Sequence, residues 1–230
     1  MSGRTAILFD LDGTLVDSVG DIARVLDRVL LASGREAAGV DKTRSWVGGG
    51  ARQLVERALG MGADASAVDR LYRAFLEAYE AEPVVDTVLF PGALSCLDEL
   101  AAQGCALGVV TNKPEALAVT VLERLGIMPI FGIVVGGRDG VPVKPAPDMM
   151  RIAIRGLDCR PAGTALVGDS KADVGAARAA GCLAVVVRGG YTNIPAENLG
   201  ADLVVDGLGA VPGALHRLHF RGSRPEAVSR

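Results

Sequence analysis

The chain has 230 residues, of which 50% are hydrophobic and 22% charged, a composition typical of a globular protein with a large core. Its formal net charge of −3 excludes the overall positive surface that nucleic-acid binding requires, so we expect no nucleic-acid partner. For the same reason, an anionic substrate would have to be held by local cations rather than by an overall attractive field.

Membrane and export signals are absent from the sequence. No apolar run is long enough to cross a membrane, and residues 1–10 lack the apolar core of a signal peptide. We therefore expect no membrane partner and a cytoplasmic location. The cysteines form no Cys-x-x-Cys pair, which indicates reduced thiols; they are Cys96, Cys105, Cys159 and Cys182. The oligomeric state cannot be inferred.

The first predicted element is a buried strand over residues 6–9, which leads directly into two aspartates. Asp10 and Asp12 lie in a turn that Gly13 makes possible, with Thr14 behind it. Ligands of parallel α/β sheets bind at the carboxyl ends of strands. Two carboxylates one residue apart repel each other unless a cation offsets their charge, and a hard divalent cation such as Mg²⁺ fits oxygen donors.

Residues 18 to about 82 change to helical spacing, and we expect no strand there. A first helix, capped by Asp17 or Ser18, ends near Gly34. The Gly-rich turn WVGGGARQ then leads to a short helix around Leu54, and Asp64 caps a further helix. Such a helical insertion beside an active-site turn is a natural lid.

From Pro91 onward, helices and strands alternate, which predicts a doubly wound parallel sheet. The expected helices are 92–103, 114–125, 147–156, 171–180 and 208–218, and the expected strands are 106–110, 132–135, 164–168, 183–187 and 203–205. The polar end, residues 221–230, is expected to be frayed.

Distinctive polar residues follow four of the predicted strands. After the Asp10 turn come Thr111-Asn112-Lys113, then Lys144 within PVKPAP, then Asp169 within GDSKADV. In a parallel sheet all of them would emerge at the same edge.

With these four segments the chain resembles the haloacid dehalogenase superfamily of phosphohydrolases. The motif D-x-D-G-T, the strand-end Thr111, the Lys144 before a proline and the G-D-x-x-x-D pair of Asp169 and Asp173 carry the resemblance. It implies a Rossmann-like core (residues 1–16 and 84–220) with an inserted α-helical cap (residues 17–83). Finer features, including VGGGARQLVERAL, VVTNKPEA and Gly190-Tyr191, are similar to phosphoglycolate phosphatases.

The resemblance implies a Mg²⁺-dependent phosphatase that works through an aspartyl-phosphate and acts on a small anionic phosphomonoester, with 2-phosphoglycolate the leading candidate. Asp10 would be the nucleophile and Asp12 the general acid and base. Further implied roles are phosphate binding (Thr111, Asn112, Lys144), magnesium binding (Asp10, the Asp12 backbone carbonyl, Asp169) and orientation of the metal shell or of Lys144 (Asp173).

The cap would read the rest of the substrate. Among the cations near the Gly-rich loop, Arg52 is the first candidate for holding a substrate carboxylate. Trp46 belongs either to the cap core or to the pocket wall. His216 and His219 have helical spacing, but no third metal ligand lies nearby in the sequence.

Several alternatives remain open. Inorganic pyrophosphatase, nucleotidase and phosphosugar phosphatase or mutase activities occur on the same fold. A dehalogenase would need neither Mg²⁺ nor an acid at the position of Asp12. A dinucleotide-binding module is disfavoured because the first strand turn lacks G-x-G-x-x-G.

Overall fold

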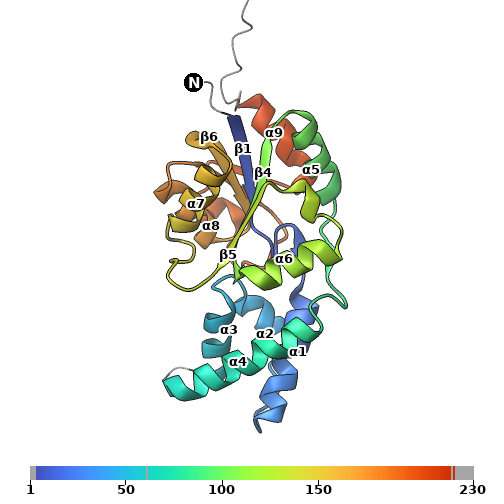
Figure 1. Cartoon of the computed structure of the whole chain (residues 1–230), viewed down its shortest axis with the longest axis vertical. Helices are drawn as coiled ribbons and strands as arrows, with labels where there is room; N and C mark the ends of the chain where they lie inside the picture. The colour runs from blue at the N-terminus through green and yellow to red at the C-terminus, as the bar shows by residue number, and fades with distance from the viewer. Residues whose placement is uncertain (1–3, 61, 219, 221–230) are drawn as a thin grey trace, which may run out of the picture.

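A six-stranded parallel sheet forms the centre of the molecule. The computed structural model describes residues 4–60, 62–218 and 220. The strands follow the order β5-β4-β1-β6-β7-β8, with β1 and β6 at the middle (Figure 1). Their bounds are Arg4–Phe9 (β1), Ala106–Pro114 (β4), Ile133–Gly137 (β5), Cys159–Gly168 (β6), Leu183–Val187 (β7) and Leu203–Val205 (β8). The predicted doubly wound α/β core is confirmed.

Helices cover both faces of this sheet because side chains alternate along each strand. Ile7 and Phe9 of β1 pack into one apolar cluster, whereas Ala6 and Leu8 pack into another on the opposite face. The first cluster includes residues of Ala93–Ala102 (α5), Glu115–Arg124 (α6) and Val211–Arg217 (α9), and the second includes residues of Asp148–Gly156 (α7) and Lys171–Ala179 (α8). Short 3₁₀ turns span Met128–Ile130 (η1), Ala196–Leu199 (η2) and Leu208–Ala210 (η3).

Four helices between β1 and β4 form a separate apolar cluster beyond one end of the sheet (Figure 1). We call them the helical insert; they are Val19–Ala32 (α1), Gly39–Trp46 (α2), Ala51–Leu59 (α3) and Ala65–Ala81 (α4). Apolar residues of α1 recur every three or four positions, so one stripe faces the other helices. As predicted, Asp64 caps α4, its side chain accepting a hydrogen bond from the N–H of Ala67.

The structure adds elements that the pattern did not predict. Two-residue strands, Val16–Asp17 (β2) and Val88–Leu89 (β3), pair antiparallel where the chain enters and leaves the insert. They are too short for any alternation to show. Both strands lie outside residues 18–82, the range in which no strand was expected. Helix α2 escaped prediction because only Thr43 of its residues is buried, which leaves no apolar stripe.

A buried carboxylate joins the two chain segments at the base of the insert. Asp21 of α1 is fully buried and accepts hydrogen bonds from the backbone N–H groups of Val85, Asp86 and Thr87 at 2.9–3.2 Å. The Thr87 hydroxyl donates a further bond at 2.6 Å, and Arg24 pairs with the same carboxylate at 3.0 Å. Burial raises the pKa of Asp21, but these donors outweigh it and lower the pKa overall.

Other expected boundaries shift by a few residues. Strand β4 continues to Pro114, β6 begins at Cys159, and the expected helix 208–218 is a 3₁₀ turn followed by α9. Residues 221–230, expected to be frayed, lie outside the described residues. Within residues 4–60, 62–218 and 220, no helix is long and apolar enough to cross a membrane. The exact division into core and cap stays a prediction.

Candidate active site

The carboxyl ends of the central strands bring the predicted residues together. Asp10 follows β1, Thr111 lies near the end of the neighbouring β4, and Asp169 follows β6 on the other side. The sequence pattern suggested that Lys144 follows a strand directly, but in the structure it does not. It lies in the loop between β5 and α7, and this loop folds back over the strand ends so that the side chain is buried.

Lys144 is the positive centre of this cluster. Its Nζ lies 2.8 Å from Oδ1 of Asp10 and 2.7 Å from Oδ1 of Asp173, and it donates to the Val110 carbonyl at 2.7 Å. Burial alone lowers the pKa of Lys144, but Asp10 and Asp173 outweigh burial and raise it, so the side chain is a cation. Burial also raises the pKa of Asp10 to about 7, although Lys144 opposes this.

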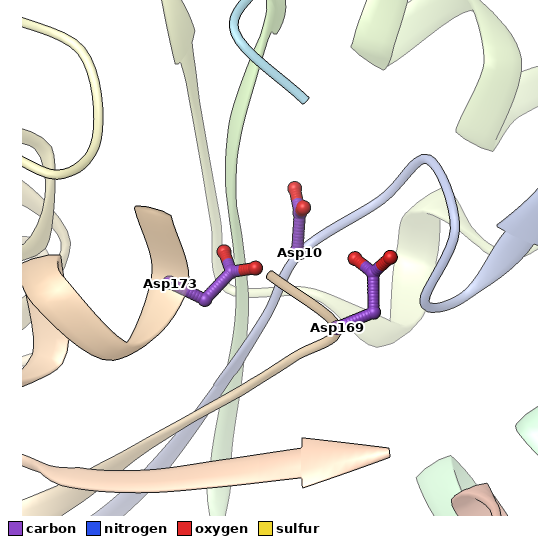
Figure 2. A group of neighbouring side chains, drawn as sticks. All are labelled: Asp10, Asp169 and Asp173. Carbon is purple, nitrogen blue, oxygen red and sulfur yellow. The ribbon is translucent and has the colours of Figure 1, made fainter. Parts of the chain in front are cut away.

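Three buried carboxylates, those of Asp10, Asp169 and Asp173, have oxygens within 4.8 Å of one another (Figure 2). Burial and the nearby Asp173 raise the pKa of Asp169 to about 6. One lysine does not balance three acids, and the donor set consists of oxygens alone. This combination fits a hard divalent cation such as Mg²⁺.

The members of this acidic group are oriented differently. Asp169 accepts hydrogen bonds from the Tyr191 N–H at 2.7 Å and from the Thr14 hydroxyl at 3.3 Å. Asp173 is fully engaged: beyond Lys144 it accepts bonds from the N–H and hydroxyl of Ser170 at 3.0 and 2.6 Å, in a capping box that begins α8. Asp173 thus contacts both Lys144 and the first turn of α8, and its predicted role of orienting the metal shell or Lys144 stays a prediction.

The turn after Asp10 has room only for glycine. Gly13 has φ +87°, and a Cβ there would lie 2.9 Å from Oδ2 of Asp169 and 3.0 Å from the Tyr191 ring. The turn directs the Asp12 side chain away from the three-carboxylate group. Asp12 accepts a hydrogen bond from the Ser18 hydroxyl at 2.6 Å and pairs with Lys113 at 3.2 Å.

Thr111 and Asn112 are consecutive residues near the end of β4, and the Asn112 side chain is held by several hydrogen bonds. Both are buried. The Asn112 side-chain N–H groups donate to the carbonyls of Gly48 and Lys144 at 2.8 and 3.0 Å, and its oxygen accepts from the Lys144 N–H at 2.9 Å. Its amide therefore connects the insert loop to the Lys144 loop, and phosphate binding by this side chain would require one of these bonds to break. Its predicted role stays a prediction.

Two residues near the site carry contacts that the sequence analysis did not assign. Lys113 has a side chain only 3% exposed, and its Nζ donates to the Tyr79 hydroxyl at 2.7 Å. The feature of the sequence that could have indicated this contact is a lysine near the end of a strand whose preceding residues are buried. The Tyr191 hydroxyl accepts bonds from the N–H groups of Ser18 and Val19 at 2.7 and 3.0 Å and donates to Asp17 at 2.7 Å.

Two spaces adjoin Asp12. One is a cavity of about 40 Å³ under the insert, lined by Asp10, Asp12, Lys113 and apolar insert side chains that include Leu54 and Phe75. The other is an open groove of about 520 Å³ between the insert loop and the core, and it also reaches Lys144 and Asp169. Substrate can thus approach through the groove, while the smaller cavity lies between the insert and the end of β4.

The remaining predicted residues lie away from these spaces. Arg52 is half exposed, pairs with Asp69 at 2.7 Å and Glu56 at 3.5 Å, and lines a separate surface groove together with Trp46. It does not line the small cavity, and its role in substrate binding stays a prediction. His216 belongs to α9, and its partner in the pattern, His219, lies outside the described residues.

The doubly wound fold and the buried acid–lysine cluster at its strand ends define an α/β protein whose candidate active site lies at the carboxyl edge of the sheet. A family model for haloacid dehalogenase-like hydrolases matches residues 7–187, and the chain belongs to this family. A phosphoglycolate phosphatase of Pseudomonas fluorescens is 39% identical over 216 residues, which cover 91% of this chain and 79% of that protein. The chain is accordingly an enzyme of the phosphatase class, similar to phosphoglycolate phosphatases.

Solved structures agree with this assignment. The crystal structure of a predicted phosphoglycolate phosphatase from Haemophilus somnus superposes with a TM-score of 0.84 at 29% identity, covering 93% of this chain and 99% of that one. A variant of CbbY from Rhodobacter sphaeroides, in complex with xylulose-(1,5)bisphosphate, gives a TM-score of 0.76 at 27% identity and covers 90% and 95% of the two chains.

Proposed function

We propose that the chain is a Mg²⁺-dependent phosphomonoester hydrolase that forms an aspartyl-phosphate on Asp10 and converts 2-phosphoglycolate to glycolate and phosphate. One observation carries the mechanism. Two aspartates one residue apart have different surroundings: Asp10 faces Lys144 and the other buried acids, whereas Asp12 faces Ser18 and Lys113. Two carboxyl groups in different environments can take the two roles of nucleophile and proton carrier.

The first step would be attack of an Asp10 carboxylate oxygen on phosphorus, with the bond from phosphorus to the ester oxygen breaking. Asp12 would give its proton to that oxygen, so that the product leaves as an alcohol. In the second step water attacks phosphorus and Asp12 takes up its proton, which restores both aspartates and releases phosphate. Lys144, buried beside Asp10, would offset the charge of the phosphoryl oxygens, with the Thr111 hydroxyl beside them.

Mg²⁺ would be held by the Asp10 and Asp169 carboxylates and the Asp12 backbone carbonyl. The first two belong to the group of three buried acids whose charge Lys144 alone does not balance. When bound, the cation would keep these acids ionised and offset the negative charge of the phosphoryl group. Asp173 supports the site by holding Lys144 at 2.7 Å.

The choice of 2-phosphoglycolate rests on size and on relatives. The cavity of about 40 Å³ beside Asp10 and Asp12 is small, which favours a small substrate. Phosphoglycolate phosphatases of Pseudomonas fluorescens and Chromobacterium violaceum cover 91% and 88% of this chain. We further propose that the insert, as a cap over residues 17–83, excludes water from this cavity and selects the substrate.

Phosphosugar hydrolysis is the second candidate, favoured by the likeness to CbbY, whose structure contains a sugar bisphosphate. The sugar of such a substrate is larger than the cavity of about 40 Å³ and would occupy the open groove of about 520 Å³ that also reaches Lys144 and Asp169. A dehalogenase is disfavoured by the acid at the position of Asp12.

A phosphate-release screen distinguishes the candidates. Purified protein is assayed with 2-phosphoglycolate, sugar phosphates, nucleotides and pyrophosphate, with Mg²⁺ and after chelation. We expect the highest kcat/KM for 2-phosphoglycolate and activity only with the metal. A better rate with a sugar phosphate or with pyrophosphate would replace the substrate assignment, whereas metal-independent hydrolysis would overturn the mechanism.

A further inference from the structure

A buried cation lines the small cavity without a role in the steps described above. Lys113 has a side chain only 3% exposed and its Nζ lies between the Asp12 carboxylate (3.2 Å) and the Tyr79 hydroxyl (2.7 Å). Burial alone lowers the pKa of Lys113, but Asp12 and Tyr79 outweigh it and raise the pKa to about 12. These contacts pair the Lys113 ammonium with one carboxylate and one hydroxyl.

Within residues 4–60, 62–218 and 220, Lys113 is the cation that lines the cavity beside Asp10 and Asp12. Most of the surrounding wall is apolar, formed by side chains such as Ile22, Leu54 and Phe75. A charge in such surroundings is costly unless it is paired. A second anionic group of a substrate that enters this cavity would meet Lys113 as the one cationic side chain among its described lining residues.

Tyr79 supplies a second donor at the same end. Its hydroxyl oxygen accepts from Lys113, and the ammonium also lies 4.3 Å from the centroid of the Tyr79 ring. In the part of the chain that the structure describes, no acceptor is found for the hydroxyl hydrogen, and Tyr79 lines the cavity. Lys113 and Tyr79 together therefore present two donors, which match the two oxygens of a carboxylate.

The position of these donors fits a short substrate. A proton carrier must touch the ester oxygen to which it donates, and Lys113 touches that carrier, Asp12. A carboxylate attached one carbon beyond the ester oxygen would lie next to this contact.

We infer that Lys113, with Tyr79, forms the subsite that binds the substrate's carboxylate, and that it sets the preference for a phosphomonoester with a carboxylate one carbon from the ester oxygen. The inference rests on the proposed function, which it deepens. Lys113 belongs to the core strand β4 and Tyr79 to helix α4 of the insert, so that the bound carboxylate joins the two parts.

The test compares two substrates of equal size, 2-phosphoglycolate and 2-phosphoglycolamide. In the second, a neutral amide replaces the carboxylate and the phosphate group is unchanged. The wild type is compared with Lys113→Met and Tyr79→Phe, and Lys42→Met serves as a control because it removes an exposed positive charge from the insert. The ratio of kcat/KM for the acid to that for the amide is measured with saturating Mg²⁺, and circular dichroism checks the fold of each variant.

We expect Lys113→Met to lower this ratio by about 10- to 100-fold, the effect of losing a charged hydrogen bond that only the acid makes. Tyr79→Phe should lower it by about 3- to 10-fold, and Lys42→Met should leave it as in the wild type. If Lys113 merely positions Asp12, both substrates lose equally and the ratio stays constant, which would overturn the inference.

Tyr79→Phe decides the matter if Lys113→Met does not fold, because it removes one oxygen and leaves the buried ring in place. An unchanged ratio in that variant would then overturn the inference. Hydrolysis of neither substrate by the wild type would overturn the proposed function and the inference with it, whereas equal losses in the variants overturn the inference alone.

Discussion

The carboxylate of Asp21 offers a sharp test of how the insert is attached to the core. It is fully buried and receives five donors, three of them backbone N–H groups of the segment that returns from the insert. Asp21→Asn keeps the volume but replaces one oxygen with a donor and removes the charge. The new NH₂ group must then face either the backbone donors or Arg24, depending on which way the amide is turned.

The cost follows from the number of bonds affected. A hydrogen bond to a charged group contributes about 1.5–3 kcal/mol, against about 0.5–1.5 kcal/mol for a neutral one. One bond lost and several weakened therefore lower the free energy of unfolding by roughly 3–5 kcal/mol. For a chain of this size each kcal/mol shifts Tm by about 2–4 °C, so we expect a decrease in Tm of roughly 10 °C.

The assay is thermal or urea unfolding followed by the fluorescence of Trp46, the one tryptophan of the chain, which lies in helix α2 of the insert. Asp86→Asn is the matched control, because it makes the same change at an exposed neighbouring position. The pKa of Asp21 is lowered, so its contribution is present above the ordinary value of 3.8 and is lost as the pH falls through the lowered value. The difference between wild type and Asp21→Asn should therefore shrink in strong acid. Equal shifts in Asp21→Asn and Asp86→Asn at pH 7 would refute the reasoning.

Four further predictions concern activity. Asp10→Asn should reduce turnover by about 10⁴-fold or more while the fold persists, because an amide cannot form the acyl-phosphate; more than a few per cent of wild-type activity would refute the nucleophile assignment. Asp12→Asn should slow both steps by about 10²- to 10⁴-fold while Mg²⁺ affinity, measured by calorimetry, changes little; an unaltered dependence of rate on leaving-group pKa would exclude proton transfer by Asp12. Chelation should abolish activity and Mg²⁺ should restore it, with Ca²⁺ a poor substitute because it takes more ligands at longer distances; full activity after chelation would contradict the metal site. Arg52→Ala should lower kcat/KM for 2-phosphoglycolate less than Lys113→Met does, since Asp69 and Glu56 already engage its guanidinium; the opposite order would assign the carboxylate to Arg52.

Local patterns were sufficient for much of the fold and for the centre of the site. The alternation of Ala6, Ile7, Leu8 and Phe9 places their side chains on the two faces of a buried strand, and helical periodicity defines α1 and α4. Because parallel strands end at one edge, their order along the chain also predicted that Asp10, Thr111 and Asp169 would meet. The strands and helices depend on neighbours within a few residues, and the meeting of the strand ends follows from the parallel arrangement that their alternation predicts.

The contacts around Asp12 depended on the tertiary structure. Lys113 and Tyr79 are 34 positions apart in the sequence and meet only when the insert packs against the end of β4. Lys144 reaches Asp10 only through the folding back of the loop after β5. Pairings between distant segments leave no periodic signal in the chain, because they depend on how whole elements pack. The sequence therefore determined the first strand and the acids that follow it, whereas packing decided which lysine lies beside Asp10 and which beside Asp12.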